Sequence, residues 1–162
     1  MRIKGRFILT AAVVFAADQA VKRWLFARMA LGETVPVIRD FFHLTLIQNS
    51  GMAFGLMQNR GWIYLVSSLA VICVLGYMAF GKTKLSKWQI FAISLVAGGA
   101  AGNLADRLAY GAVIDFLDFR GIWPFIFNGA DMAIVAGSFL FAICYVRDEF
   151  RNGAAEDGDG HE

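Results

Sequence analysis

Residues 62–80 form a strongly apolar run of nineteen residues without a charge. A run of this length can cross the hydrocarbon core of a bilayer as a helix. Two further runs, at about 88–107 and 129–146, are apolar over most of their length. Hydrophobic residues make up 58% of the chain and charged residues only 17%, which is more apolar than a soluble globular domain. The sequence therefore predicts an integral membrane protein.

The N-terminal segment, about residues 7–26, is predicted to supply a fourth span. A basic stretch precedes an uncharged run over residues 7–17, a pattern that secretory signal peptides share. No small-residue cleavage site closes that run, and Asp18, Lys22 and Arg23 follow at once, so we expect the helix to be retained. The predicted fold class is an all-α integral membrane protein with four transmembrane helices and a small extracytoplasmic β-like region after the first helix.

The segment between the first two spans has a different pattern. Apolar and polar residues alternate over much of residues 31–59, and Gly32 and Pro36 interrupt the segment, which favours short strands and turns outside the bilayer. A loop containing two glycines, Asn49 to Gly55, closes it. We expect one membrane domain over residues 1–147. The polar tail, 148–162, is rich in Gly, Asp and Glu and is predicted to be disordered and cytoplasmic.

The distribution of basic residues predicts the orientation. Four spans place both termini on one side, and dense basic clusters lie in the first six residues and in residues 82–87. The positive-inside rule then favours N-in and C-in. In this orientation, polar residues gather at the outer ends of three spans, which indicates one shared site at the outer face. These residues are Asp18, Lys22, Asn103, Arg107, Asn128 and Asp131.

Carboxylate chemistry remains after other classes are excluded. The chain has only two histidines and no HExxH or phosphate-loop motif, which argues against catalytic triads, zinc hydrolases and nucleotide use. The net charge of +2 is too small to indicate nucleic acid. Asp115 and Asp131 lack a neighbouring cation in the sequence, and a close carboxylate pair can act as general base and general acid. Alternatively, Asp131 caps the fourth helix and Asp115 faces water.

Five motifs resemble the lipoprotein signal peptidase family, the type II signal peptidases. They are Asp18-Gln19-x-x-Lys22, Asn49-x-Gly51-x-Ala53-Phe54, Gly102-Asn103-x-x-Asp106-Arg107, Val113-Ile114-Asp115-Phe116 and Phe127-Asn128-x-Ala130-Asp131. The resemblance covers about residues 7–147. It implies a four-span aspartic peptidase of the bacterial inner membrane, with its active site at the outer (periplasmic) face. Such an enzyme removes signal peptides from diacylglyceryl-modified prolipoproteins, cleaving before the lipid-modified cysteine.

The resemblance also implies roles for individual residues. Asp115 and Asp131 would form the catalytic pair. The supporting or substrate-binding residues would be Asp18, Lys22, Asn49, Gly51, Asn103, Arg107 and Asn128. A serine commonly follows the second catalytic aspartate in this family, whereas this chain has Met132, which removes any hydrogen bond expected from that position. No metal and no cofactor are expected.

Two other functions fit the polar residues. A small proton-coupled membrane carrier would use intramembrane carboxylates, although transport sites tend to lie near the midplane. A structural membrane subunit would use the polar groups only to join helices. For the peptidase interpretation, the expected partners are the lipid-modified prolipoprotein and membrane lipids, and the protein is expected to be a monomer.

Overall fold

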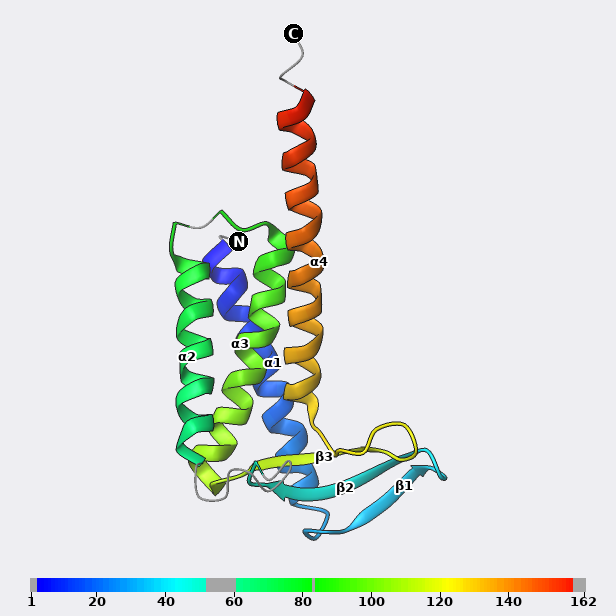
Figure 1. The fold of residues 1–162 in the computed structure, drawn as a ribbon. Helices are drawn as coiled ribbons and strands as arrows, with labels where there is room; N and C mark the ends of the chain where they lie inside the picture. The colour runs from blue at the N-terminus through cyan, green and yellow to red at the C-terminus, as the bar shows by residue number, and fades with distance from the viewer. Residues whose placement is uncertain (1–2, 52–60, 83, 159–162) are drawn as a thin grey trace.

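The computed structural model describes residues 3–51, 61–82 and 84–158. Four helices stand side by side, and a small sheet lies across one end of the bundle and projects from it (Figure 1). In chain order the elements are α1 (Ile3–Phe26), β1 (Thr34–Ile38), β2 (Phe42–Asn49), α2 (Gly61–Phe80), α3 (Lys87–Tyr110), β3 (Val113–Phe119) and α4 (Gly129–Gly158). The four predicted helices are present at the expected places in the chain.

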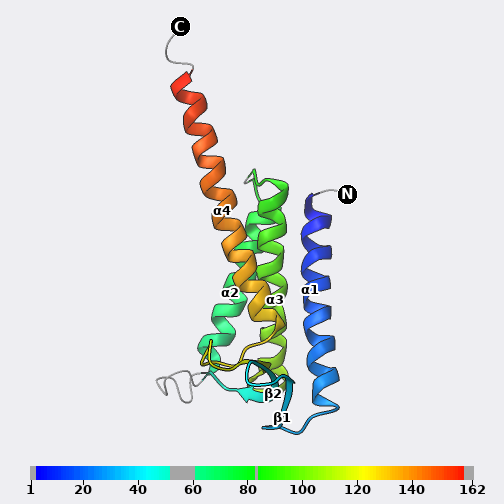
Figure 2. The same cartoon turned by 90° about the vertical axis from the view of Figure 1, so that its right-hand side faces the viewer.

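Helix α3 is the centre of the bundle, because α1, α2 and α4 all pack mainly against it (Figures 1 and 2). Glycines allow this close approach. A Cβ atom on Gly98 would lie 2.7 Å from the carbonyl oxygen of Ala11 on α1, and one on Gly99 would collide with the carbonyl of Ala130 on α4. The small-residue face of α3 is therefore filled by the neighbouring helices.

Three of the described helices are long and apolar enough to cross a membrane. They are α2 over Trp62–Phe80, α3 over Lys87–Tyr110 and α4 over Gly129–Arg151. Helix α1 is as long as α3, at 24 residues, but Asp18, Lys22 and Arg23 interrupt its apolar sequence.

The sheet is antiparallel with strand order β1-β2-β3. The first two strands lie in the region predicted to be β-like. The third strand corrects the prediction, which treated residues 113–119 as a connection between helices and the fold as all-α outside residues 31–59. Strand β3 forms because β2 supplies its partner, with Ile47 opposite Asp115 and Asn49 opposite Val113. Such long-range pairing is not visible in a local sequence pattern.

A second correction concerns the tail, which the sequence analysis predicted to be disordered from residue 148. Helix α4 continues to Gly158, so the prediction is wrong for residues 148–158. Extending an existing helix adds one hydrogen bond per residue without a new nucleation cost. Alanine and glutamate in this stretch favour that extension despite its polarity.

A buried apolar cluster joins the sheet to the bundle. Leu25, at the end of α1, packs against Leu46 of β2 and against Ile114 and Phe116 of β3. This contact fixes β3 beneath the ends of α1 and α3. It therefore fixes the position of Asp115, which lies between Ile114 and Phe116 in β3.

Candidate active site

Asp115 lies in the middle of β3 and is almost fully buried, with 2% of its surface exposed. Both of its oxygens accept hydrogen bonds from side-chain amides. Asn49 of β2 donates to Oδ2 over 2.8 Å, and Asn128 donates to Oδ1 over 2.6 Å. The alternative in which Asp115 faces water is therefore wrong.

Asp131 occupies the first turn of α4, where it forms a reciprocal capping arrangement with Asn128. The backbone N–H of Asp131 donates to Asn128 Oδ1 over 3.0 Å, and the backbone N–H of Asn128 donates to Asp131 Oδ2 over 3.2 Å. Asp131 thus takes part in the cap that the alternative interpretation expected. Because Asn128 also donates to Asp115, one residue contacts both carboxylates of the predicted pair.

Asn103, near the end of α3, binds the other oxygen of Asp131. Its Nδ2 donates to Asp131 Oδ1 over 2.7 Å. Its Oδ1 accepts from Lys22 Nζ and from Asn128 Nδ2, both over 3.2 Å. A lysine ammonium can only donate, so this contact determines which end of the Asn103 amide faces Asp131.

Lys22 is surrounded by carboxylates at the interface of α1 and α3. Its Nζ lies 2.8 Å from Asp18 Oδ2 and 2.7 Å from Asp106 Oδ2, and all three side chains are buried. The predicted proximity of Asp18 and Lys22 is confirmed. Asp106, by contrast, has its ion pair with Lys22 and not with its sequence neighbour Arg107.

Two members of this cluster, Gln19 and Asp106, were not among the predicted site residues. Asp106 accepts a hydrogen bond from Gln19 Nε2 over 2.8 Å and one from the backbone of Ile114 over 3.2 Å. The second bond attaches β3 to α3. Both residues stand inside the quoted motifs, so their positions were available, but the sequence cannot show that Asp106 turns towards α1.

The polar residues open into a cavity of about 70 Å³ lined by Asn49, Gly51, Asn103, Arg107, Val113, Asp115 and Asp131. Six of these seven belong to the predicted site. The other predicted residues, Asp18, Lys22 and Asn128, lie behind the cavity, where they hold its walls through the bonds given above. Asp18 also accepts from the backbone N–H of Ala130 over 3.0 Å, which ties α1 to the start of α4.

Arg107 reaches the cavity from α3 and contacts α2. Its guanidinium lies 5.3 Å from the ring centroid of Tyr64 and donates to Ser68 Oγ over 3.4 Å. No carboxylate lies within ion-pair distance of Arg107 among the residues that the structure describes. The guanidinium therefore forms no direct ion pair within that part of the chain, although the charges of Asp131 and Asp115 act on it.

Gly51 has a conformational reason to be glycine. Its φ is +88°, and a Cβ atom there would lie 2.5 Å from the Tyr64 ring. Its N–H donates to Asn49 Oδ1 over 2.9 Å, and its carbonyl accepts from the Tyr64 hydroxyl over 3.1 Å. These bonds orient the Asn49 amide towards Asp115. The rest of the predicted loop, Met52 to Gly55, lies outside the described residues. Met132, where the family commonly has serine, is 55% exposed.

Burial dominates the electrostatics of Asp115. The pKa of Asp115 is raised to about 6, chiefly by loss of solvent and in smaller part by the neighbouring charge of Asp131, while the hydrogen bonds from Asn49 and Asn128 act to lower it. Two close carboxylates titrate as a unit and can share one proton. A pair that holds one proton can deprotonate a water molecule and protonate a leaving group.

Three comparisons with known proteins agree. The chain matches the family described as signal peptidase (SPase) II over residues 10–147. It is 43% identical over 142 residues to the lipoprotein signal peptidase of Desulfitobacterium hafniense, covering 87% of this chain and 93% of that protein. For the lipoprotein signal peptidase of Pelotomaculum thermopropionicum the values are 44% over 147 residues, with 90% and 94% covered. A solved structure described as a bacterial membrane enzyme superposes with a TM-score of 0.80 at 30% identity, covering 90% of both chains.

Proposed function

Because the chain belongs to the signal peptidase II family, we propose that it removes the signal peptide from lipid-modified bacterial prolipoproteins. The scissile bond is the peptide bond before the modified cysteine, and Asp115 and Asp131 are the catalytic pair. The observation that carries this assignment is the position of Asn128, which donates to both carboxylates at one small cavity.

In the proposed reaction, the pair starts with one proton. The ionised carboxylate takes a proton from a water molecule, and the oxygen of that water attacks the scissile carbonyl. The protonated carboxyl then gives its proton to the departing amine nitrogen, so the peptide bond breaks and the pair again holds one proton. Burial raises the pKa of Asp115, which favours the protonated form of this carboxyl.

Arg107 and Asn49 are proposed to bind the substrate backbone next to the pair. Arg107 lines the cavity without a carboxylate partner among the described residues, so its N–H groups can donate to a peptide carbonyl. Donors that face the position where negative charge develops on the carbonyl oxygen lower the barrier to attack. Lys22 and Asp18 act from behind the cavity and do not meet the substrate, whereas Asn103 lines the cavity and holds Asp131 in place.

We propose that α1 is a fourth span. Two of the three charges that interrupt its sequence, Asp18 and Lys22, are buried against α3 and paired with each other, which removes them from lipid. The exposed face of α1 is apolar, with Ile8, Leu9 and Val13 more than half exposed. Figures 1 and 2 show α1 running alongside α3 for most of its length.

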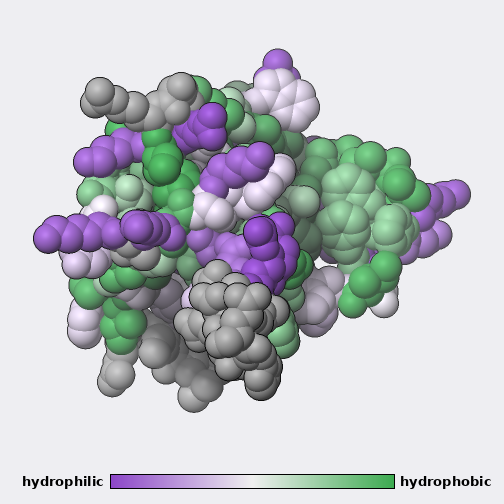
Figure 3. Space-filling view, turned by 90° about the horizontal axis from the view of Figure 1, so that it is seen from above, coloured by the Kyte–Doolittle hydropathy of each residue, from purple (hydrophilic) through white to green (hydrophobic). Residues whose placement is uncertain are grey.

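The proposed orientation is N-in and C-in in the bacterial inner membrane, with the cavity at the outer face. The sheet that carries Asp115 lies at the end of the bundle away from both termini (Figure 1). Viewed from the C-terminal end of the bundle, a broad apolar surface covers the projecting sheet (Figure 3). Exposed apolar residues next to strands β2 and β3 include Phe41, Ile122, Trp123 and Phe125. Such a surface suits contact with the outer leaflet, and we propose that the enzyme works there as a monomer among membrane lipids.

The experiment that tests the function is direct. Purified protein is incubated with a synthetic prolipoprotein that carries the diacylglyceryl group, and the products are separated by mass. We expect a shortened lipopeptide that begins at the modified cysteine, and an unmodified precursor should remain intact. If neither precursor is shortened by folded protein, while purified protein in vesicles moves protons across the membrane, the carrier interpretation replaces this proposal.

A further inference from the structure

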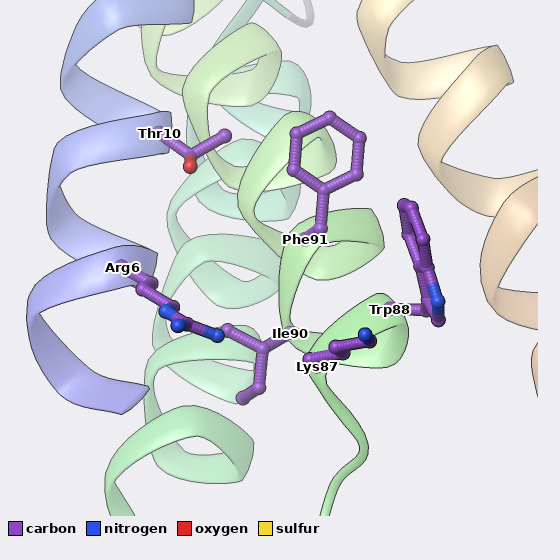
Figure 4. Close-up of a pocket in the computed structure, with 6 residues that line it drawn as sticks. All are labelled: Arg6, Thr10, Lys87, Trp88, Ile90 and Phe91. Atoms are coloured by element: carbon purple, nitrogen blue, oxygen red, sulfur yellow. The ribbon is translucent and has the colours of Figure 1, made fainter. Parts of the chain in front are cut away.

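A second and larger cavity lies at the end of the bundle opposite the candidate active site. Its volume is about 280 Å³, and it opens between the N-terminal parts of α1 and α3. Its walls are Arg6 and Thr10 of α1 and Lys87, Trp88, Ile90 and Phe91 of α3 (Figure 4). In Figure 4 the Arg6 side chain extends from α1 towards α3, and Lys87 turns towards Trp88. The peptidase function does not use this cavity.

The basic residues that line the cavity favour an anionic ligand. Two of its six lining residues are basic and none is acidic. Within the described part of the chain, neither Arg6 nor Lys87 forms an ion pair with a carboxylate. The Lys87 ammonium has an aromatic neighbour instead, 5.7 Å from the Trp88 ring centroid. Two exposed cations that face one space, with a threonine hydroxyl beside them, suit a phosphate group.

The apolar residues of the lining favour an anionic ligand that also has an apolar part. Trp88 and Phe91 are 48% and 41% exposed, and Ile90 is buried. Lys87 and Trp88 begin a candidate membrane span, a level at which tryptophan and lysine meet lipid headgroups. A soluble phosphate would gain nothing from the aromatic walls, whereas the glycerol and first acyl carbons of a lipid would.

We propose that this cavity binds the headgroup of an anionic glycerophospholipid, such as phosphatidylglycerol, in the leaflet opposite the active site. Arg6 and Lys87 hold the phosphate, and Trp88 and Phe91 contact the carbons below it. The volume lies just below the usual range of ligand pockets, which begins at about 300 Å³. The cavity therefore takes the headgroup, while the acyl chains lie outside along the apolar surface of α1.

Such a lipid would connect two helices. Arg6 and Lys87 belong to α1 and α3, the same two helices that Lys22 and Asp106 join at the other end of the bundle. A ligand bound to both helices stabilises the folded protein by mass action. The bound lipid would thus support the helix pair behind the active site without contacting it.

The test is a lipid titration of the full-length protein in an uncharged detergent, followed by native mass spectrometry. Phosphatidylglycerol is compared with phosphatidylcholine of the same acyl chains. The double substitution Arg6→Gln with Lys87→Gln should weaken phosphatidylglycerol binding about thirtyfold, since each basic residue near anionic lipid contributes about fivefold. Thr10→Phe, which fills the cavity without changing the charge, should weaken binding as well.

The matched control is Lys82→Gln with Lys84→Gln. It removes the same charge from the same end of the bundle, at exposed residues that do not line this cavity, and it should change the affinity less than about threefold. Equal losses in the two double variants would overturn the proposal in favour of a diffuse surface charge. Equal binding of the two lipids, or displacement of phosphatidylglycerol by millimolar inorganic phosphate, would also overturn it.

Discussion

Lys22 of α1 donates a 3.2 Å hydrogen bond to the side-chain oxygen of Asn103 on α3, and through this bond it determines how Asn103 faces Asp131. Among the described residues, the ammonium forms no ion pair with Asp115 or Asp131, the proposed catalytic pair. Its positive charge is matched by Asp18 and Asp106 instead. Lys22 is therefore a positioning residue, whose loss should affect folding and turnover together.

The first prediction follows from that cluster. Lys22→Ala leaves the buried carboxylates of Asp18 and Asp106 without their cation, which should cost about 3–5 kcal/mol of folding free energy. Thermal unfolding of the purified variant in detergent should show a large drop in Tm, and cleavage should fall as well. Arg23→Ala is the control, because Arg23 is exposed, and it should shift stability by about 0.5 kcal/mol or less. A Lys22→Ala protein with the Tm of the wild type would contradict the structural role.

The second prediction concerns the pair itself. Asp115→Asn and Asp131→Asn should each lower the cleavage rate by about 10²–10⁴-fold, because an amide cannot take the proton of water. Asparagine keeps the size of aspartate, so both variants should remain folded in the membrane. The double variant should be little slower than either single one, since groups that act as a unit are non-additive.

Asp118→Asn is the matched control for these variants. Asp118 stands three residues after Asp115 on β3, but its Oδ2 accepts from Thr45 over 2.7 Å and from Arg120 over 3.2 Å, away from the cavity. Its turnover should stay within about threefold of the wild type. Substantial cleavage by either Asp115→Asn or Asp131→Asn would exclude the two-aspartate mechanism.

The third prediction concerns pH. The pKa of Asp115 is raised from 3.8 to about 6 in the folded protein, chiefly by burial. The folded state then holds a proton between about pH 4 and 6 that the unfolded state has released. The contribution of Asp115 to stability is therefore full below about pH 4 and is lost as the pH rises through about 6, by about 3 kcal/mol. The unfolding free energy of the wild type and of Asp115→Asn should be measured from pH 4 to 7. The decrease with rising pH that Asp115 causes should be absent in the variant.

Asp118, in the same strand, has a pKa shift of the opposite sign. Its burial is opposed by the bonds from Thr45 and Arg120, and its pKa is lowered. It thus contributes stability above its unfolded pKa, and that contribution is lost as the pH falls through the folded value. Asp118→Asn should accordingly remove the part of the unfolding free energy that increases with pH. If Asp115→Asn leaves the pH dependence of unfolding unchanged, the raised pKa is excluded.

The fourth prediction tests the contact between α1 and α3 at Gly102. A Cβ atom there would lie 2.5 Å from Asp18 Oδ2, so Gly102→Ala must displace the carboxylate that pairs with Lys22. We expect a loss of about 1–3 kcal/mol in unfolding free energy. Gly76→Ala on α2 is the control, because a Cβ atom there meets nothing within 4 Å, and it should be neutral or slightly stabilising. Equal effects at the two glycines would contradict this account of the packing.

The fifth prediction concerns orientation. In a variant without Cys73 and Cys144, a cysteine introduced at Lys84 should react with membrane-impermeant maleimide only after the cytoplasmic side is opened. A cysteine at Ile122, which is 68% exposed between β3 and α4, should react in cells whose outer membrane is permeable and whose inner membrane is intact. Labelling of the Lys84→Cys variant in such cells would reverse the proposed topology.

The helices could be predicted because each depends on a local pattern. Uncharged runs mark α2, α3 and α4, and the ends of α3 have local causes, a capping box between Ser86 and Gln89 and a left-handed Gly111 with φ of 70°. These features require no knowledge of the rest of the chain. Six of the seven residues that line the cavity were likewise predicted, because they fall in motifs that a family resemblance identifies.

The contacts between these elements could not be predicted in the same way. The sequence places Asp106 beside Arg107, yet the rotation of α3 directs Asp106 towards Lys22 and Arg107 towards Tyr64. Strand β3 depends on hydrogen bonds to β2, about seventy residues earlier in the chain. Helix rotation and strand pairing are set by tertiary packing, which overrides local preference.

The dual role of Asn128 has a consequence for biosynthesis. It caps the first turn of α4 and also donates to Asp115, so the proposed catalytic pair cannot assemble before the final helix has entered the membrane and met β3. A nascent chain with only its first three helices inserted would hold Asp115 without its partner carboxylate. Proteolytic competence is thereby delayed until the ribosome has completed the transmembrane domain, and truncated products would be inert towards other membrane proteins.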